Sequence, residues 1–130
     1  MARVLVDTSA IYALLDRDDV EHGAAKSRLR ALKKARAEPI LTNFVVAESH
    51  ALLLARLGAG VARTWLVGNV WHVERATEAD EAKARQIVAE YTDKTFSFTD
   101  AVSFAVMERL AVKRAFAFDR HFRQYGFEVV

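Results

Sequence analysis

The sequence contains no cysteine, which excludes disulfide bonds, thiolate nucleophiles and cysteine-rich zinc sites. One proline and five glycines in 130 residues argue against a flexible linker or a disordered tail. The first apolar run, residues 4–6, ends at Asp7, so we expect no signal peptide, and no run approaches the ~18 apolar residues of a membrane span. These absences favour one domain, residues 1–130, in a reducing cytoplasm, with no membrane partner.

What the sequence has in abundance is apolar side chains. Hydrophobic residues make up 52% of the chain, which is enough to form a buried core. The formal net charge is +2 and the isoelectric point is about 9.1, a basic balance too weak to identify a polyanionic partner by itself. The positions of the charged residues are therefore more informative than their sum.

Short apolar runs alternate with helical patterns along the whole chain. This alternation predicts a three-layer α/β/α fold with a central parallel sheet of about five strands. The predicted strands are residues 4–6, 40–42, 70–73, 115–118 and 127–130, and the predicted helices are 10–15, 20–37, 43–57, 61–67, 77–91 and 97–112. The third of these helices is apolar nearly all round, which predicts that it is buried.

Four acids follow strands or begin the helices after them. Asp7 and Asp119 come directly after predicted strands, and at ~100° per residue Glu48 and Asp100 fall on the apolar faces of their helices. Because the carboxyl ends of parallel strands share one edge of a sheet, these acids are expected to converge. Taken singly, each acid also fits a turn, a helix cap or a first-turn position favoured by the helix dipole.

Four neighbouring carboxylates repel one another, and a divalent cation relieves that repulsion. Oxygen-only ligands select a hard ion such as Mg²⁺ or Mn²⁺, and such a site suits hydrolysis of phosphodiesters. Two alternatives remain open. One is a non-catalytic RNA-binding or interaction module, and the other is an aspartyl-phosphate phosphoryl-transfer domain, which Ser9 disfavours because that chemistry needs a second acid there.

Four motifs in order resemble those of PIN-domain ribonucleases, and more narrowly those of VapC-type toxins of toxin–antitoxin pairs. They are VDTSA at residues 6–10, NFVVAE at 43–48, FTDAVSFA at 98–105 and AFDRHF at 117–122. The resemblance spans essentially the whole chain. It implies a Mg²⁺- or Mn²⁺-dependent endoribonuclease that is usually a homodimer and is held inactive by a cognate antitoxin covering its site.

The resemblance also implies roles for individual residues. The metal ligands and catalytic acids would be Asp7, Glu48, Asp100 and Asp119, and Thr8 and Thr99 would orient ligands or water behind them. One departure is His121, which stands where many family members have a further acid. It implies weaker binding of a second metal, and His121 is either a contact to substrate phosphate or a plain surface histidine.

Residues beside the last acid are candidates for binding the RNA substrate. Arg120 and Arg123 flank Asp119 and are expected to contact phosphates, whereas the basic face of residues 26–36 is expected to be merely solvated. The stretch 52–66 is a candidate dimer or antitoxin surface. Four phenylalanines are predicted to lie in the core rather than to stack on bases: Phe98, Phe104, Phe116 and Phe118.

Overall fold

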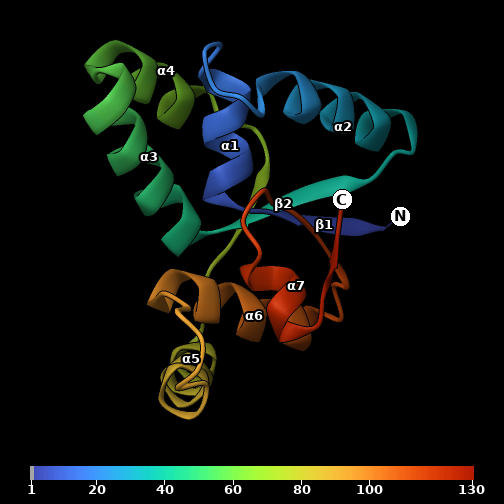
Figure 1. The fold of residues 1–130 in the computed structure, drawn as a ribbon, viewed down its shortest axis with the longest axis vertical. Coiled ribbons are helices and arrows are strands. Elements are labelled where there is room, and N and C mark those ends of the chain that lie inside the picture. Colours follow the sequence, from blue (N-terminus) through green and yellow to red (C-terminus); the bar gives the residue numbers. More distant parts are fainter. Residues whose placement is uncertain (1) are drawn as a thin grey trace.

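A five-stranded parallel sheet lies at the centre of the computed structural model, which describes residues 2–130 (Figure 1). The strand order is β3-β2-β1-β4-β5, and every pairing is parallel. The strands are β1 (Arg3–Val6), β2 (Glu38–Thr42), β3 (His72–Glu74), β4 (Arg114–Phe116) and β5 (Glu128–Val129). The predicted fold class is confirmed.

Helices connect the strands and cover the sheet. They are α1 (Thr8–Leu15), α2 (His22–Lys34), α3 (Asn43–Leu57), α4 (Ala59–Gly68), α5 (Glu78–Glu90), α6 (Phe98–Leu110) and α7 (His121–Tyr125). The helix predicted over residues 20–37 is shorter at both ends, and the strand predicted over 115–118 begins one residue earlier and stops at Phe116. Within residues 2–130, none of the helices has the length and apolar character needed to cross a bilayer.

Alternating side chains of β1 separate two hydrophobic cores. Val4 and Val6 pack with residues of α1, α2, α3 and α4, whereas Leu5 packs with residues of α5, α6 and α7. This is the two-residue period of a strand that is covered on both faces. Figure 1 shows the two helical layers on opposite sides of the sheet.

The strand order reverses beside the central strand. From β1 the chain builds outward through β2 to β3, and it then returns to the other side of β1 to add β4 and β5. Ligands of open α/β sheets bind where the strand order reverses, outside the carboxyl ends of the strands. Here that point lies between β1 and β4, where the backbone N–H of Asp7 donates to the Phe116 carbonyl at 3.0 Å.

Helix α3 differs from its prediction, because it is buried along one stripe only. Its buried residues are Val45, Ser49 and Leu53, spaced four apart, while Glu48 and Leu54 are exposed. The helix packs mainly against α1 and α4, which cover this one stripe. Among the other large apolar residues of α3, Leu54 is exposed, whereas Phe44, Val46 and Leu57 are half-buried against the cores.

An ion-pair network fixes the far end of α6. Arg109 donates from Nε and Nη2 to Asp80 at 3.0–3.1 Å and from Nη2 to Glu74 at 3.2 Å. The Asp80 side chain is only 5% exposed and also closes a capping box with Thr77. Burial acts to raise the pKa of Asp80, but the hydrogen bonds from Arg109 and Thr77 outweigh it and hold that pKa below its usual range.

Replacing Arg109 by methionine is expected to destabilise the fold by about 2 kcal/mol, because the buried Asp80 carboxylate loses its partner. We place the value below that of a fully buried pair because Arg109 itself is partly solvated. Urea unfolding measures the loss. The matched control is Lys83→Met, which removes the surface pair with Glu108 and should cost less than about 1 kcal/mol. Equal losses in the two variants would contradict the expectation.

Candidate metal centre

Asp7 lies at the end of β1 and caps the N-terminus of α1. It is 3% exposed, and its Oδ2 accepts hydrogen bonds from the Ser9 backbone N–H at 3.2 Å and from Ser9 Oγ at 2.7 Å. Ser9 Oγ in turn accepts from the backbone N–H of Phe118 at 2.9 Å. Ser9 thus joins the ends of β1 and β4, a role that the sequence did not reveal.

Asp100 enters the site from the first turn of α6. Its Oδ2 accepts from the Ser97 backbone N–H at 3.0 Å, while its own N–H donates to Ser97 Oγ, so the two residues form a capping box. The prediction that Asp100 points inward is confirmed, because its side chain is buried. Its Oδ2 also lies 2.9 Å from Nδ1 of His121.

Asp119 and His121 come from the turn between β4 and α7. The backbone N–H of His121 donates to Asp119 Oδ1 at 3.0 Å, which folds the turn so that both side chains face Asp100. Ligand atoms of Asp100, Asp119 and His121 all lie within 4.8 Å of one another. His121 is therefore not a plain surface histidine. We call Asp7, Asp100, Asp119 and His121 the acid cluster.

Electrostatics links Asp7 to the same cluster. Burial, and then the neighbouring charge of Asp119, raise the pKa of Asp7 well above its ordinary value, against a lowering by Ser9. Burial also raises the pKa of Asp100, and the charge of Asp119 raises it further. The hydrogen bond from the Ser97 backbone and the neighbouring His121 lower this pKa, but they do not outweigh burial. The charge of Asp119 thus opposes the ionisation of both Asp7 and Asp100, and the three carboxyl groups form a donor set suited to a hard cation.

The other predicted site residues lie around this cluster. Glu48 is exposed on α3 and does not belong to the group of ligand atoms found within residues 2–130. The Thr8 hydroxyl is buried and accepts from Ser49 Oγ at 3.1 Å, which ties α1 to α3. Thr99 is half-buried beside Asp100, and the two predicted phosphate-binding arginines next to Asp119 are exposed: Arg120 and Arg123.

Replacing Ser9 by alanine is expected to weaken Mn²⁺ binding by about 10- to 100-fold, the usual effect of removing a group that orients a metal ligand. The variant leaves Asp7 without its shortest hydrogen bond and the Phe118 N–H without an acceptor. Calorimetric titration with Mn²⁺ measures the affinity. Ser9→Thr keeps the hydroxyl and should bind Mn²⁺ within a few-fold of the unmodified protein, and unchanged affinity in Ser9→Ala would contradict the role.

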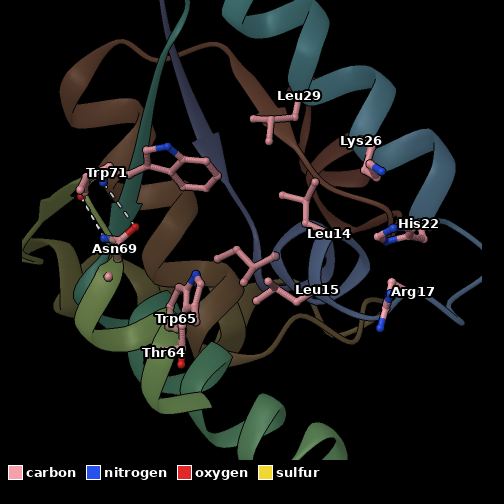
Figure 2. Close-up of a pocket in the computed structure, with 13 residues that line it drawn as sticks. Leu14, Leu15, Arg17, His22, Lys26, Leu29, Thr64, Trp65, Asn69 and Trp71 are labelled. Carbon is pink, nitrogen blue, oxygen red and sulfur yellow. Dashed lines mark hydrogen bonds between the residues drawn. The ribbon is translucent and has the colours of Figure 1, made fainter. Parts of the chain in front are cut away.

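A second feature is an apolar groove of about 710 Å³ between α1, α2 and α4 (Figure 2). Trp65 and Trp71 face it across from Leu14 and Leu29, and none of the acid cluster lines it. The Asn69 side chain donates to the Trp71 carbonyl at 3.1 Å and accepts from the Trp71 N–H at 3.3 Å, which fixes the approach to β3. The charged residues along its α1–α2 side are Arg17 and Lys26, with His22 between them.

The family model of the PIN domain matches residues 4–128, so the chain belongs to the PIN-domain family. Within it, the chain is of the VapC type. It is 37% identical over 129 residues to the 23S rRNA-specific endonuclease VapC20 of Mycobacterium tuberculosis, with 95% of each chain covered. It is 27% identical over 124 residues to Ribonuclease VapC26 of the same organism, covering 92% of this chain and 89% of that protein.

A solved structure shares the fold. The crystal structure of Mycobacterium tuberculosis VapC20, described as a Sarcin-Ricin loop cleaving toxin, matches with a TM-score of 0.85 and 31% sequence identity over 95% of each chain. The resemblance drawn from the four sequence motifs is thereby confirmed.

Proposed function

We propose that this protein is a Mg²⁺- or Mn²⁺-dependent endoribonuclease that acts in the cytoplasm as the toxin of a toxin–antitoxin pair. The observation that carries the proposal is that ligand atoms of Asp100, Asp119 and His121 lie within 4.8 Å of one another, next to the buried Asp7, whose pKa the charges of Asp119 and Asp100 raise. The names of its VapC relatives, an rRNA-specific endonuclease and a ribonuclease, support the same reaction class.

The residues of the site would have different roles in this reaction. Asp7, Asp100 and Asp119 would hold the ion, and Glu48 would approach from α3 as the fourth carboxylate. When bound, the ion would polarise a phosphoryl oxygen and lower the pKa of water that attacks the phosphate. His121 keeps Nδ1 against Asp100, and its other ring nitrogen would contact the phosphate.

The remaining predicted residues would support this arrangement. The Thr8 and Thr99 hydroxyls would orient ligands or water around the carboxylates. The exposed Arg120 and Arg123 would bind phosphates of the RNA on either side of the reacting one.

The test is cleavage of 23S rRNA, chosen because VapC20 is named for that substrate. We expect cleavage in Mg²⁺ or Mn²⁺, none in EDTA, and recovery when Mn²⁺ is restored. Asp100→Asn should lower the rate at least ~100-fold, beyond the usual effect of a residue that only orients a ligand. Cleavage that survives both EDTA and Asp100→Asn would refute the proposal.

Two other outcomes would point to the alternatives. Binding of RNA without turnover in Mn²⁺ would favour a non-catalytic module on the same fold. A hydroxylamine-sensitive acyl phosphate on Asp7 would favour phosphoryl transfer, although Ser9 Oγ already donates to that carboxylate.

We further propose that the groove binds the antitoxin. Its floor is apolar and its α1–α2 side carries cations, so an antitoxin segment with apolar side chains and acidic neighbours would complement it. Bound there, such a segment could continue along α1 towards the acid cluster, because Asp7 caps the start of that helix.

The protein is also proposed to form a homodimer through the exposed apolar residues of α3 and α4. They include Leu54 on α3 and Val61 and Leu66 on α4, which are large apolar side chains exposed on neighbouring helices. Leu54→Glu is expected to convert the dimer to a monomer in size-exclusion chromatography with light scattering. Glu90→Gln, on the exposed surface of α5, is the control and should stay dimeric.

A further inference from the structure

We propose that Phe98 is a stacking platform for one unpaired base of an RNA strand that crosses the acid cluster, an inference that rests on the proposed ribonuclease function. Phe98 is the first residue of α6 and is 36% exposed, so the prediction that it belongs to the core is wrong. Among residues 2–130 it is the single aromatic member of the exposed large hydrophobic side chains. By contrast, Phe104 and Phe116 are fully buried, as predicted.

The Phe98 ring is held in place from within the protein. It packs against Phe44 at the start of α3, with ring centroids 5.4 Å apart and planes at 85°. Edge-to-face packing of this kind fixes the orientation of both rings. A ring that is already fixed loses little conformational entropy when a ligand stacks on it, which favours binding.

Phe98 also lies two residues from the acid cluster along α6. It shares the first turn of α6 with Asp100, a member of the acid cluster. Its partner Phe44 precedes Glu48 by four residues on α3, and residues at that spacing share one helix face. The Phe98 ring therefore extends from α6, the helix that supplies Asp100, to the face of α3 that carries Glu48. Figure 1 shows the start of α3 next to α6.

A cation accompanies the ring. The guanidinium carbon of Arg85, on α5, is 5.8 Å from the Phe98 ring centroid. Across residues 2–130, Arg85 forms no ion pair with an acid, so its charge is available for a phosphate. Arg85 lies over the Phe98 ring, so a base would stack on the face that the guanidinium leaves free while Arg85 contacts a phosphate. Aromatic stacking combined with arginine is how proteins bind single-stranded nucleic acid without reading sequence.

The structure thus favours an unpaired base over a duplex. Bases within an RNA duplex are already stacked on their neighbours and present no free face to a side chain, whereas bases in loops and single strands do. Stacking on one phenylalanine tolerates every base, so Phe98 would contribute affinity and position rather than sequence preference.

The experiment measures binding of a short single-stranded RNA containing 2-aminopurine, whose fluorescence is quenched by stacking. All proteins carry Asp7→Asn and are assayed in EDTA, so that no RNA is cleaved. Phe98→Leu, which keeps apolar packing against Phe44, is expected to weaken binding by about 5- to 100-fold and to remove the fluorescence change. Phe98→Tyr restores an aromatic face and should bind within about twofold of the parent.

Arg85 supplies an independent readout. Arg85→Gln should reduce the slope of log affinity against log salt by about 0.7, the value for one phosphate contact to a single strand. The matched control, Lys113→Gln, removes an exposed cation at the amino end of β4 and should leave this slope unchanged. A second control, Val88→Ala, removes an exposed apolar side chain from α5 and should not alter binding.

The possible results separate the two proposals. The stacking platform is refuted if Phe98→Leu binds the single-stranded RNA as tightly as its parent and with the same quenching. It is also refuted if the substitution weakens binding of duplex RNA as much as binding of single-stranded RNA. If the protein with Asp7 intact cleaves no RNA in Mn²⁺, the ribonuclease proposal fails, while the binding series still decides the role of Phe98.

Discussion

Replacing Asp7 by asparagine is expected to abolish RNA cleavage and, in the same protein, to raise the melting temperature measured in EDTA. The carboxylate is buried, and burial together with Asp119 raises its pKa well above that of an unfolded chain. Ionising Asp7 at neutral pH therefore costs more in the folded state than in the unfolded state. Asparagine removes that cost and can still accept the hydrogen bonds from Ser9.

The size and the pH dependence of this effect follow from linkage. The folded state is destabilised once the pH exceeds the unfolded pKa of about 3.9, and the penalty grows until the pH passes the raised folded pKa. Each tenfold difference in proton affinity corresponds to about 1.4 kcal/mol, which shifts the melting temperature of a domain of this size by several degrees. The difference between the two proteins in EDTA should thus be near zero at pH 4 and widen towards pH 7.

Metal should reverse the order of stability. A ligand present at 100 times its dissociation constant stabilises a folded protein by about 2.7 kcal/mol, and Asp7→Asn should gain much less from Mn²⁺ than the unmodified protein. Thermal unfolding in EDTA and in Mn²⁺ at several pH values measures both effects. The control is Asp93→Asn, which changes an exposed acid paired with Lys94. Its melting temperature in EDTA should not exceed that of the unmodified protein. A variant that melts lower than the unmodified protein in EDTA would contradict this account.

Replacing Phe104 by alanine is expected to destabilise the protein by about 3–5 kcal/mol, a large share of the 5–15 kcal/mol typical of a folded domain. The side chain is fully buried at the centre of an aromatic cluster. It stacks on Tyr125 with centroids 4.5 Å apart and meets Phe96 and Phe122 edge-on at 5.0 and 5.1 Å. Removing it leaves a cavity that these rings cannot fill.

The same change should disturb the metal centre. Phe104 lies one turn after Asp100 on α6, and Phe96 packs edge-on against both Phe104 and His121. Urea unfolding measures the stability, and Mn²⁺ affinity at a temperature where the variant is folded measures the site. Val88→Ala, at an exposed position of α5, should cost less than about 0.5 kcal/mol. A loss below 1 kcal/mol for Phe104→Ala would show that the cluster repacks.

Much of the fold and part of the site could be predicted because the deciding signals are local. An acid directly after an apolar strand located Asp7, and the helix-face pattern located Asp100, whose position is now explained by its capping box with Ser97. Asp119 was found for a reason that is only partly correct. Its strand ends at Phe116, and the Phe118 N–H bonds to Ser9 Oγ instead of to a neighbouring strand.

The remaining features depend on tertiary contacts between elements, which the periodicity of the sequence does not encode. The helical wheel identified the apolar side around Glu48, but not that Glu48 itself is exposed beside the buried Val45. His121 belongs to the acid cluster because its backbone N–H donates a hydrogen bond to the Asp119 side chain and so closes a tight turn. A turn of this kind leaves no periodic pattern in the sequence. Phe98 was assigned to the core because apolarity alone does not distinguish a buried ring from one held at the surface.

The central position of β1 has a consequence for the synthesis of the protein. Asp7 leaves the ribosome well before Asp119, and the two can meet only after β4 has added beside β1. A nascent chain that has not emerged as far as Asp119 therefore lacks part of the acid cluster. If the cluster carries the nuclease activity, that chain is harmless to the ribosome that is making it, and so is a product that terminates before β4.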